Sequence, residues 1–146
     1  MDKQIIYTNL LDKQQLRSTK QRNKIFEIFA QASHPLSAVE VASLSAESAD
    51  TATTYRTIDT FLKAEILRRV SAGWKDAYEL SEHFVPHHHH FTCLHCGKIT
   101  SFGEPVELIQ SLRHLAESQC GANMHNHSIE LSGLCKSCSQ TYKTLK

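Results

Sequence analysis

The stretch His87-His-His-His90-Phe-Thr-Cys93-Leu-His-Cys96-Gly-Lys98 holds two patterns that decide the second half of the chain. Cys93 and Cys96 are separated by two residues, and Cys135 and Cys138 repeat this spacing near the end of the sequence. Such a gap lets both thiolates of one turn reach one ion, and two such turns complete a tetrahedral sulfur shell suited to Zn²⁺. The sequence therefore predicts two zinc knuckles that bind one structural zinc ion through these four cysteines.

A redox Cys-x-x-Cys pair and incidental cysteines are the alternatives to a zinc site. Two pairs supply four ligands together, whereas neither pair does so alone, which favours zinc. Cys120 has no partner motif and is expected to be a half-buried free thiol. The start of the chain does not resemble an export signal, and no apolar run approaches the ~20 residues that span a bilayer. We therefore expect a cytoplasmic protein with reduced thiols and no membrane partner.

The four consecutive histidines, His87 to His90, form the second pattern. On a strand, His88 and His90 would face one side and His87 and His89 the other. One tetrapeptide can then supply two separate metal sites. Imidazole binds Zn, Fe, Ni and Co alike, so the pattern leaves the metal open. The alternative is a solvated histidine cluster in a linker.

The first half of the chain has the pattern of helices. Apolar residues recur at helical spacing from Ile25 to Ala32, preceded by Ser18 and Gln21 at capping-box spacing. The dipeptide His34-Pro35 is expected to end this helix. Ser37 and Glu40 repeat the capping-box spacing and predict a short second helix.

A third helix and a hairpin follow. Asp50 or Thr51 can cap this helix, whose inner face holds Ile58, Phe61 and Leu62. Two β-compatible runs, Leu67–Ser71 and Ala77–Leu80, flank a turn that contains Gly73 and predict a hairpin. Three helices followed by a hairpin is the element order of a winged helix-turn-helix, although such an order alone does not require DNA binding.

The character of the sequence changes near Glu82, after which cysteine and histidine dominate. One long helix is expected beyond this point, with Pro105 near its first turn and Gly121 after its end. Its buried face is predicted to hold Leu108, Leu112 and Leu115. His127, Ile129 and Leu131 then alternate as one face of a strand.

These elements predict an α+β protein with three segments. Residues 1–82 form an N-terminal winged helix-turn-helix domain, 83–87 a linker or hinge, and 88–146 a C-terminal α/β dimerisation domain with zinc knuckles. At 146 residues, the chain has room for two small domains of this kind.

Charge indicates where nucleic acid would bind. The formal net charge is only +1, so any affinity for DNA must come from local clustering. Residues 13–24 carry five basic residues, Arg17 among them, and no acidic residue. The run Thr51-Ala-Thr53-Thr-Tyr55-Arg56 begins the third helix, and a recognition helix uses its N-terminal residues on base edges. Arg17, Thr53, Tyr55 and Arg56 are the candidate DNA-contacting residues, and the alternative is an ordinary solvated face.

Assembled in order, these motifs resemble the ferric uptake regulator family over nearly the whole chain. The resemblance rests on Leu16 to Arg22, Ala52-Thr-Thr-Tyr-Arg56, Tyr78-Glu-Leu80, the histidine and Cys93/Cys96 run, Asn126-His-Ser128 and the Cys135/Cys138 pair. Six motifs in order over about 120 residues make coincidence very improbable.

The resemblance implies a homodimeric repressor of metal-uptake genes that binds a palindromic, A/T-rich operator in double-stranded DNA. It implies up to three metal sites per chain. The cysteines would form the structural zinc site, and His34, Glu79, His88 and His90 a regulatory site. His87, His89, Glu107 and His127 would form an additional site. The regulatory metal would be Fe²⁺ or Zn²⁺, with Mn²⁺ possible.

The chain departs from the family pattern at several positions. Thr54 stands where valine is usual. His89 stands where ferric uptake regulators commonly have aspartate, and a histidine at this position is more similar to zinc-responsive relatives. Relative to the family pattern, two extra residues lie between Glu79 and the histidines, so Glu82 or His83 could replace Glu79 as a ligand. A peroxide-sensing regulator of the same family is an alternative. Peroxide-sensing relatives favour aspartate at the position of Glu79, so the glutamate here weakens that alternative.

Two other classes of protein compete with a repressor. A zinc hydrolase would need an open metal position and a general base, and the chain has neither HExxH nor a nucleophile elbow. A metal-storage or zinc-binding protein without DNA-binding function would not need the Thr51–Arg56 motif or a wing. We therefore expect no enzyme activity, no catalytic residues and no small organic substrate.

Overall fold

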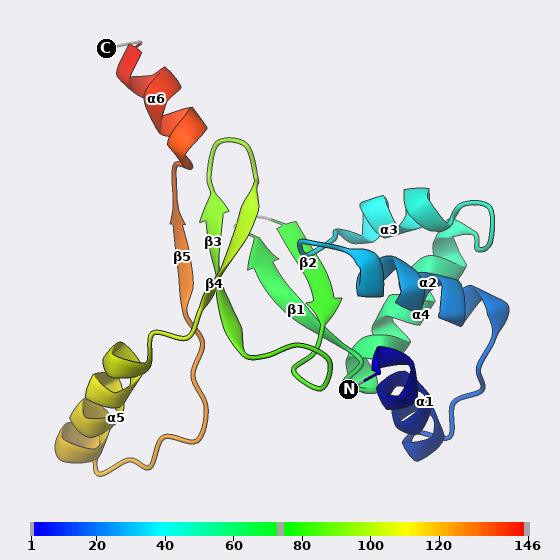
Figure 1. Ribbon diagram of the computed structural model, residues 1–146, viewed down its shortest axis with the longest axis horizontal. Coiled ribbons are helices and arrows are strands. Elements are labelled where there is room, and N and C mark those ends of the chain that lie inside the picture. The colour runs from blue at the N-terminus through cyan, green and yellow to red at the C-terminus, as the bar shows by residue number, and fades with distance from the viewer. Residues whose placement is uncertain (1, 73–74, 145–146) are drawn as a thin grey trace. The chain divides into compact units, whose positions relative to one another are not determined.

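The computed structural model describes residues 2–72 and 75–144, and the chain forms two compact units, Met1–Pro86 and His87–Lys146 (Figure 1). Among the described residues, no helix is both long and apolar enough to cross a membrane. The first unit is mainly helical with a two-stranded hairpin, and the second is built on a three-stranded sheet. The protein is thus α+β, as predicted.

The first unit consists of four helices followed by a hairpin (Figure 1). Its elements are α1 Lys3–Lys13, α2 Lys20–Gln31, α3 Ala38–Ser45, α4 Thr51–Lys63, β1 Leu67–Ala72 and β2 Lys75–Leu80. β1 and β2 are antiparallel, with Leu67 opposite Leu80, and Leu36 forms an isolated bridge to Tyr78. Helices α2 to α4 with this hairpin are the expected winged helix-turn-helix. The turn expected at Gly73 lies outside the described residues.

Local capping explains where three of the helices begin. Ser37 and Glu40 form the predicted capping box before α3. Asp50 caps α4, since its carboxylate accepts the Thr53 backbone N–H at 2.6 Å. The cap predicted at Ser18 is wrong by one residue, because the Thr19 hydroxyl accepts the Arg22 backbone N–H at 3.3 Å. Ser18 instead donates its hydroxyl to the Asn23 side chain at 3.0 Å.

Helix α1 was not expected from the sequence, yet it contributes to the core of the first unit. The Tyr7 ring stacks on Phe26 with centroids 4.0 Å apart and meets Phe61 edge-on at 5.9 Å. Its hydroxyl donates to Asn23 at 3.1 Å, and burial raises the pKa of Tyr7 to about 12. Tyr7 therefore fixes α1 against α2 and α4, which also supply Ile25 and Ile58 to the core.

The second unit is a three-stranded sheet in the order β4-β3-β5, with two helices (Figure 1). Its elements are β3 His88–Cys93, β4 Ile99–Gly103, α5 Val106–Cys120, β5 Glu130–Gly133 and α6 Lys136–Thr144. β3 pairs antiparallel with β4 and parallel with β5. The cysteine turn after Cys93 joins β3 to β4.

Two expectations for this unit were wrong. The last strand begins at Glu130, so His127 and Ile129 precede it rather than lying on it. The predicted buried face of α5 is exposed in the single chain, at 52% for Leu108, 43% for Leu112 and 48% for Leu115. Ile109 is instead the buried residue of this helix. Helix α6 was not expected.

Candidate functional site

Strand β3, with His87 directly before it, arranges the four histidines in two opposed pairs. The His88 and His90 rings lie with centroids 4.8 Å apart, and the His87 and His89 rings are separated by the same distance. His89 and His90 are buried, although they are consecutive in the chain. The alternation predicted for a strand is therefore confirmed, and one tetrapeptide presents imidazoles on both faces of the sheet.

The four paired cysteines converge on one point. Ligand atoms of Cys93, Cys96, Cys135 and Cys138 all lie within 4.8 Å of one another. The Sγ atoms of Cys96 and Cys135 are 3.8 Å apart. A tetrahedron with Zn–S bonds of about 2.3 Å has edges of about 3.8 Å, so this spacing fits a four-coordinate zinc ion. Gly97 closes the first turn with φ of 72°, a backbone conformation that favours glycine.

Hydrogen bonds within this cluster shift the pKa values of its thiols in both directions. The Cys135 backbone N–H donates to Cys93 Sγ at 3.3 Å and, with the backbone N–H groups of Cys96 and His95, lowers the pKa of Cys93 to about 6. The Ser137 hydroxyl, 3.2 Å from Cys135 Sγ, lowers the pKa of Cys135. A hydrogen bond with the Cys135 sulfur raises the pKa of Cys138 to about 12. Thiolates are the zinc-binding form, so the lowered pKa values of Cys93 and Cys135 favour metal binding.

A second cluster lies on the His87/His89 face. Ligand atoms of His87, His89, Glu104 and His127 all lie within 4.8 Å of one another. The Nε2 atoms of His87 and His127 are 3.3 Å apart, and the Glu104 carboxylate lies 2.8 Å from His89 Nε2 and 3.1 Å from His127 Nε2. Tetrahedral edges for metal–nitrogen bonds of about 2.0–2.1 Å are about 3.3 Å long. The donor set and its spacing therefore fit a divalent metal.

Glu104 occupies the position that the resemblance assigned to Glu107. Glu107 is exposed in the first turn of α5 and does not belong to this group of side chains. Glu104 follows β4 directly, and the register pairs His88 with Gly103. Continuing the antiparallel register by one residue sets Glu104 beside His87. No spacing in the sequence marks Glu104 as a ligand, because the pairing of β3 with β4 brings it to the histidines.

The electrostatics of Glu104 suit a metal-binding carboxylate. Burial disfavours its charged form, but hydrogen bonds from His89 and His127 outweigh that cost and hold the pKa of Glu104 below its ordinary value. Its carboxylate thus stays ionised among three imidazoles. Neutral imidazole and ionised carboxylate are the forms that bind a metal ion.

The residues predicted for the regulatory site belong to different parts of the chain. His88 and His90 share one face of β3, as described above. Glu79 lies on β2 with a side chain only 14% exposed, and its Oε1 atom lies 2.7 Å from the Arg68 guanidinium. His34 is exposed between α2 and α3. Of the two alternative ligands, Glu82 also contacts Arg68, at 3.2 Å, and His83 lies 3.6 Å from Glu65.

Three of the four predicted DNA-contacting residues line one recess of the first unit. Arg17, Thr53 and Arg56 contribute to it, and Arg22 adds a further guanidinium. The Arg22 guanidinium donates to the Arg17 carbonyl at 2.6 Å, which fixes the segment before α2. Tyr55 does not line this recess, but it is 44% exposed on the same helix. The start of α4 is therefore accessible and flanked by cations.

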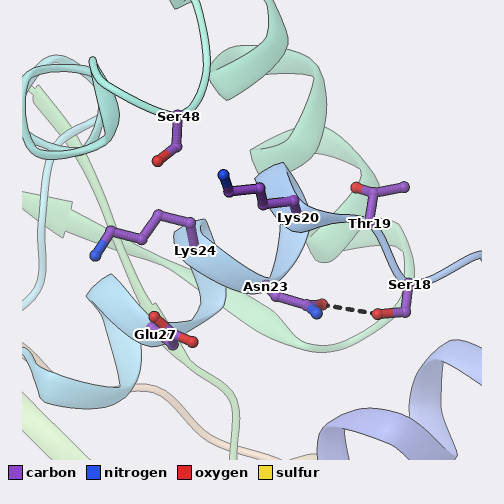
Figure 2. A pocket seen from close by; sticks show the side chains of 7 residues that line it. All are labelled: Ser18, Thr19, Lys20, Asn23, Lys24, Glu27 and Ser48. Carbon is purple, nitrogen blue, oxygen red and sulfur yellow. Dashed lines mark hydrogen bonds between the residues drawn. The ribbon is translucent and has the colours of Figure 1, made fainter.

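A second recess lies along α2, where two lysines and the Glu27 carboxylate line it together with polar uncharged side chains. Figure 2 shows Lys20 and Lys24 reaching along it from α2, with Ser48 on the segment before α4. Thr19 lines both recesses, so they meet at the N-terminus of α2. Lys20 and Lys24 were part of the predicted basic stretch but were not singled out. Cations and hydroxyls of this kind contact phosphates rather than base edges.

Cys120 stands apart from these sites. It is the last residue of α5 and is exposed, rather than half-buried as predicted. It does not belong to any of the candidate metal clusters formed by residues 2–72 and 75–144.

Known proteins share this fold and sequence pattern. The Yersinia pestis ferric uptake regulation protein is 35% identical over 126 residues, covering 83% of this chain and 82% of that protein. The structure of the Francisella tularensis ferric uptake regulator with iron has 30% identity and a TM-score of 0.74, covering 85% of this chain and 95% of that one. The Helicobacter pylori ferric uptake regulator has a TM-score of 0.80 and covers 95% of both chains; at 23% identity it supports the fold alone.

The family match spans both units of the chain. The sequence model described as the Ferric uptake regulator family covers residues 13–132, which include the recognition helix α4, the histidine strand β3 and the first cysteine pair. The fold agrees with this match over nearly the full length. This chain belongs to the ferric uptake regulator family of metal-responsive transcriptional regulators.

Proposed function

We propose that this protein is a homodimeric repressor that a regulatory divalent metal converts into its operator-binding form, and that it controls metal-uptake genes. The observation that carries this proposal is the division of imidazoles by strand β3, with His87 and His89 on one face and His88 and His90 on the other. A strand that supplies two metal shells beside a cysteine cluster suits a sensor better than a storage protein, which has no need of distinct sites.

The cysteine cluster is proposed to bind structural Zn²⁺. Its sulfur spacing matches the edge of a zinc tetrahedron, and the ion would join β3 to α6 through Cys93, Cys96, Cys135 and Cys138. The second cluster, His87, His89, Glu104 and His127, is proposed to bind an additional divalent ion. Both shells consist of four protein donors, whereas a catalytic zinc keeps an open position. Because neither proposed shell keeps an open position for substrate or water, both sites suit a structural or regulatory role better than a catalytic one.

The regulatory ion is proposed to bind His88 and His90, with His34 and Glu79 completing its shell. This set rests on the family resemblance and on the face that His88 and His90 share. Fe²⁺ is the first candidate, because the Francisella tularensis relative was solved with iron, and Zn²⁺ and Mn²⁺ suit the same ligand types. The ion shifts the protein toward its DNA-binding form only by binding that form more tightly.

The DNA partner is proposed to be a palindromic, A/T-rich duplex bound by two recognition helices of a homodimer in the cytoplasm. Tyr55 and Arg56 on α4 would read bases, while Arg17, Arg22 and the recess of Figure 2 would contact phosphates. The exposed leucines of α5 are proposed to pack against a second copy of the chain. Apolar side chains at this spacing form one face of a helix that a single chain leaves uncovered.

The test is an electrophoretic mobility shift of a palindromic A/T-rich duplex, with the metal-loaded protein and after mild chelation. Loaded protein is expected to shift the duplex, and chelation to abolish the shift while the cysteine-bound zinc remains. Arg56→Ala should weaken binding by ~1–3 kcal/mol if it contacts a base. DNA binding that changes neither on chelation nor in Arg56→Ala would contradict the proposal. Binding controlled by peroxide at constant metal would favour a peroxide sensor instead.

A further inference from the structure

Arg68 forms an ion pair with the carboxylate proposed as a regulatory ligand. The β1–β2 register sets Arg68 directly opposite Glu79, so their side chains share one face of the hairpin. Arg68 Nε and Nη2 both lie 2.7 Å from Glu79 Oε1. Two N–H groups on one oxygen make a strong charge-assisted contact.

The same guanidinium also contacts a second carboxylate. Arg68 Nη1 donates to Glu82 Oε1 at 3.2 Å. The side chain of Glu82 is 53% exposed, whereas that of Glu79 is 14% exposed. The contact with Glu79 is therefore shorter and more shielded from solvent than the contact with Glu82. Glu82 offers Arg68 an acceptor close by when Glu79 has another cation to bind.

A divalent ion and a guanidinium compete for the electron pairs and the negative charge of one carboxylate. An ion that binds Glu79 must weaken the contact with Arg68 and place a second cation near the guanidinium. We propose that Arg68 sets the metal concentration at which the regulatory site fills, by holding Glu79 in the metal-free protein and passing to Glu82 as the metal binds. This inference rests on the proposed role of Glu79 as a regulatory ligand.

The proposal predicts opposite effects on metal affinity for replacing Arg68 and for replacing Glu82. Replacing Arg68 removes the competing cation, so Arg68→Gln is expected to tighten metal binding by about tenfold, the scale of releasing one hydrogen bond to a charged group. Replacing Glu82 removes the alternative acceptor, so Glu82→Gln is expected to weaken metal binding. Arg68→Lys keeps a cation on the same strand and should stay close to the unchanged protein. A purely structural role for the hairpin would not move Arg68→Gln and Glu82→Gln in opposite directions.

The experiment is a Co²⁺ titration of the full-length, zinc-loaded protein against a competing chelator. All proteins carry Glu104→Gln and His127→Ala, which replace two of the four donors of the additional metal site and leave the regulatory site to be measured. The series compares Glu79→Gln, Arg68→Gln, Arg68→Lys and Glu82→Gln. The matched control is Arg69→Gln, since Arg69 is the neighbouring cation on β1 and pairs with Asp76 at 3.3 Å. Thermal melting of each metal-free variant measures the stability of the fold separately.

The outcomes separate the two levels of the proposal. The expected result is weaker Co²⁺ binding in Glu79→Gln, tighter binding in Arg68→Gln and little change in Arg69→Gln. If Glu79→Gln weakens binding but Arg68→Gln leaves it unchanged or weakens it, the inference about Arg68 is overturned and the regulatory role of Glu79 stands. If Glu79→Gln binds Co²⁺ like the unchanged protein, Glu79 is not a ligand, and both claims fail together.

Discussion

At the scale of single residues, Glu104 shows how a backbone register selects a ligand. Its carboxylate lies within hydrogen-bonding distance of three imidazoles, while Glu107, three residues later, is exposed. We predict that Glu104→Gln lowers the affinity of the additional site for metal about 10- to 100-fold, as expected when one charged donor is weakened. Glu107→Gln should have little effect. Metal-resolved mass spectrometry of both variants checks this, and the reverse ranking would restore Glu107 as the ligand.

Thr54 stands where valine is usual in the family, and the Ser45 hydroxyl gives its buried hydroxyl a hydrogen-bond partner. Its side chain is fully buried, donates to the Asp50 carbonyl at 3.1 Å and lies 3.0 Å from the Ser45 hydroxyl. We predict that Thr54→Val costs about 1 kcal/mol of unfolding free energy and that adding Ser45→Ala costs little more. Thr57→Val, which removes only a bond to a backbone carbonyl, should not couple to Ser45→Ala. Denaturant unfolding of Thr54→Val, Ser45→Ala and the double variant measures this coupling. If the two single losses of unfolding free energy add up in the double variant, the two hydroxyls do not interact.

At the scale of elements, the recognition helix α4 depends on its N-cap. The Thr53 backbone N–H stabilises the Asp50 carboxylate and lowers its pKa below the ordinary value of 3.8. A lowered folded-state pKa adds stability above the ordinary pKa, and this stability is lost as pH falls through the folded pKa.

Asp50→Asn keeps an acceptor at this cap but cannot titrate. We therefore predict that this variant loses less stability below about pH 4 than the unchanged protein does, while both begin from similar values at neutral pH. Asp50→Ala should be less stable than both at neutral pH, and it should also weaken DNA binding. Thermal melts between pH 3 and 7 measure these differences. Equal acid sensitivity of the unchanged protein and Asp50→Asn would contradict the role of the carboxylate.

Elements with local signals were predictable, and those held by distant contacts were not. Ser37 and Asp50 are capping residues whose effect lies within three residues of the chain, and strand alternation gave the opposed histidine pairs. Helix α1 was missed because its main anchor is the Tyr7 ring, which packs against residues of α2 and α4. Glu104 was missed for a similar reason, since a strand register and not a sequence spacing brings it to the imidazoles.

At the scale of the whole molecule, α5 leaves an apolar face that a second copy is proposed to cover. Leu108, Leu112 and Leu115 follow one another at helical spacing and are each more than 40% exposed. We predict that Leu112→Lys converts the protein to monomers and abolishes operator binding, because a charge inside an apolar interface is not compensated. Gln110→Lys, on the opposite side of the helix, should remain dimeric. Light scattering after size-exclusion chromatography tests this, and a dimeric Leu112→Lys would exclude α5 as the interface.

The central claim is that the two faces of β3 have different roles, with His88 and His90 acting on DNA binding. The measurement is the affinity for a palindromic A/T-rich duplex as a function of free Fe²⁺, held anaerobically, for alanine variants of His87, His88, His89 and His90. A metal-dependent gain of 100-fold corresponds to about 2.7 kcal/mol of coupling. We predict that His88→Ala and His90→Ala abolish this gain while the cysteine-bound zinc remains, and that His87→Ala and His89→Ala only reduce it. Loss of the gain in His87→Ala and His89→Ala, with His88→Ala and His90→Ala responding normally, would contradict the account.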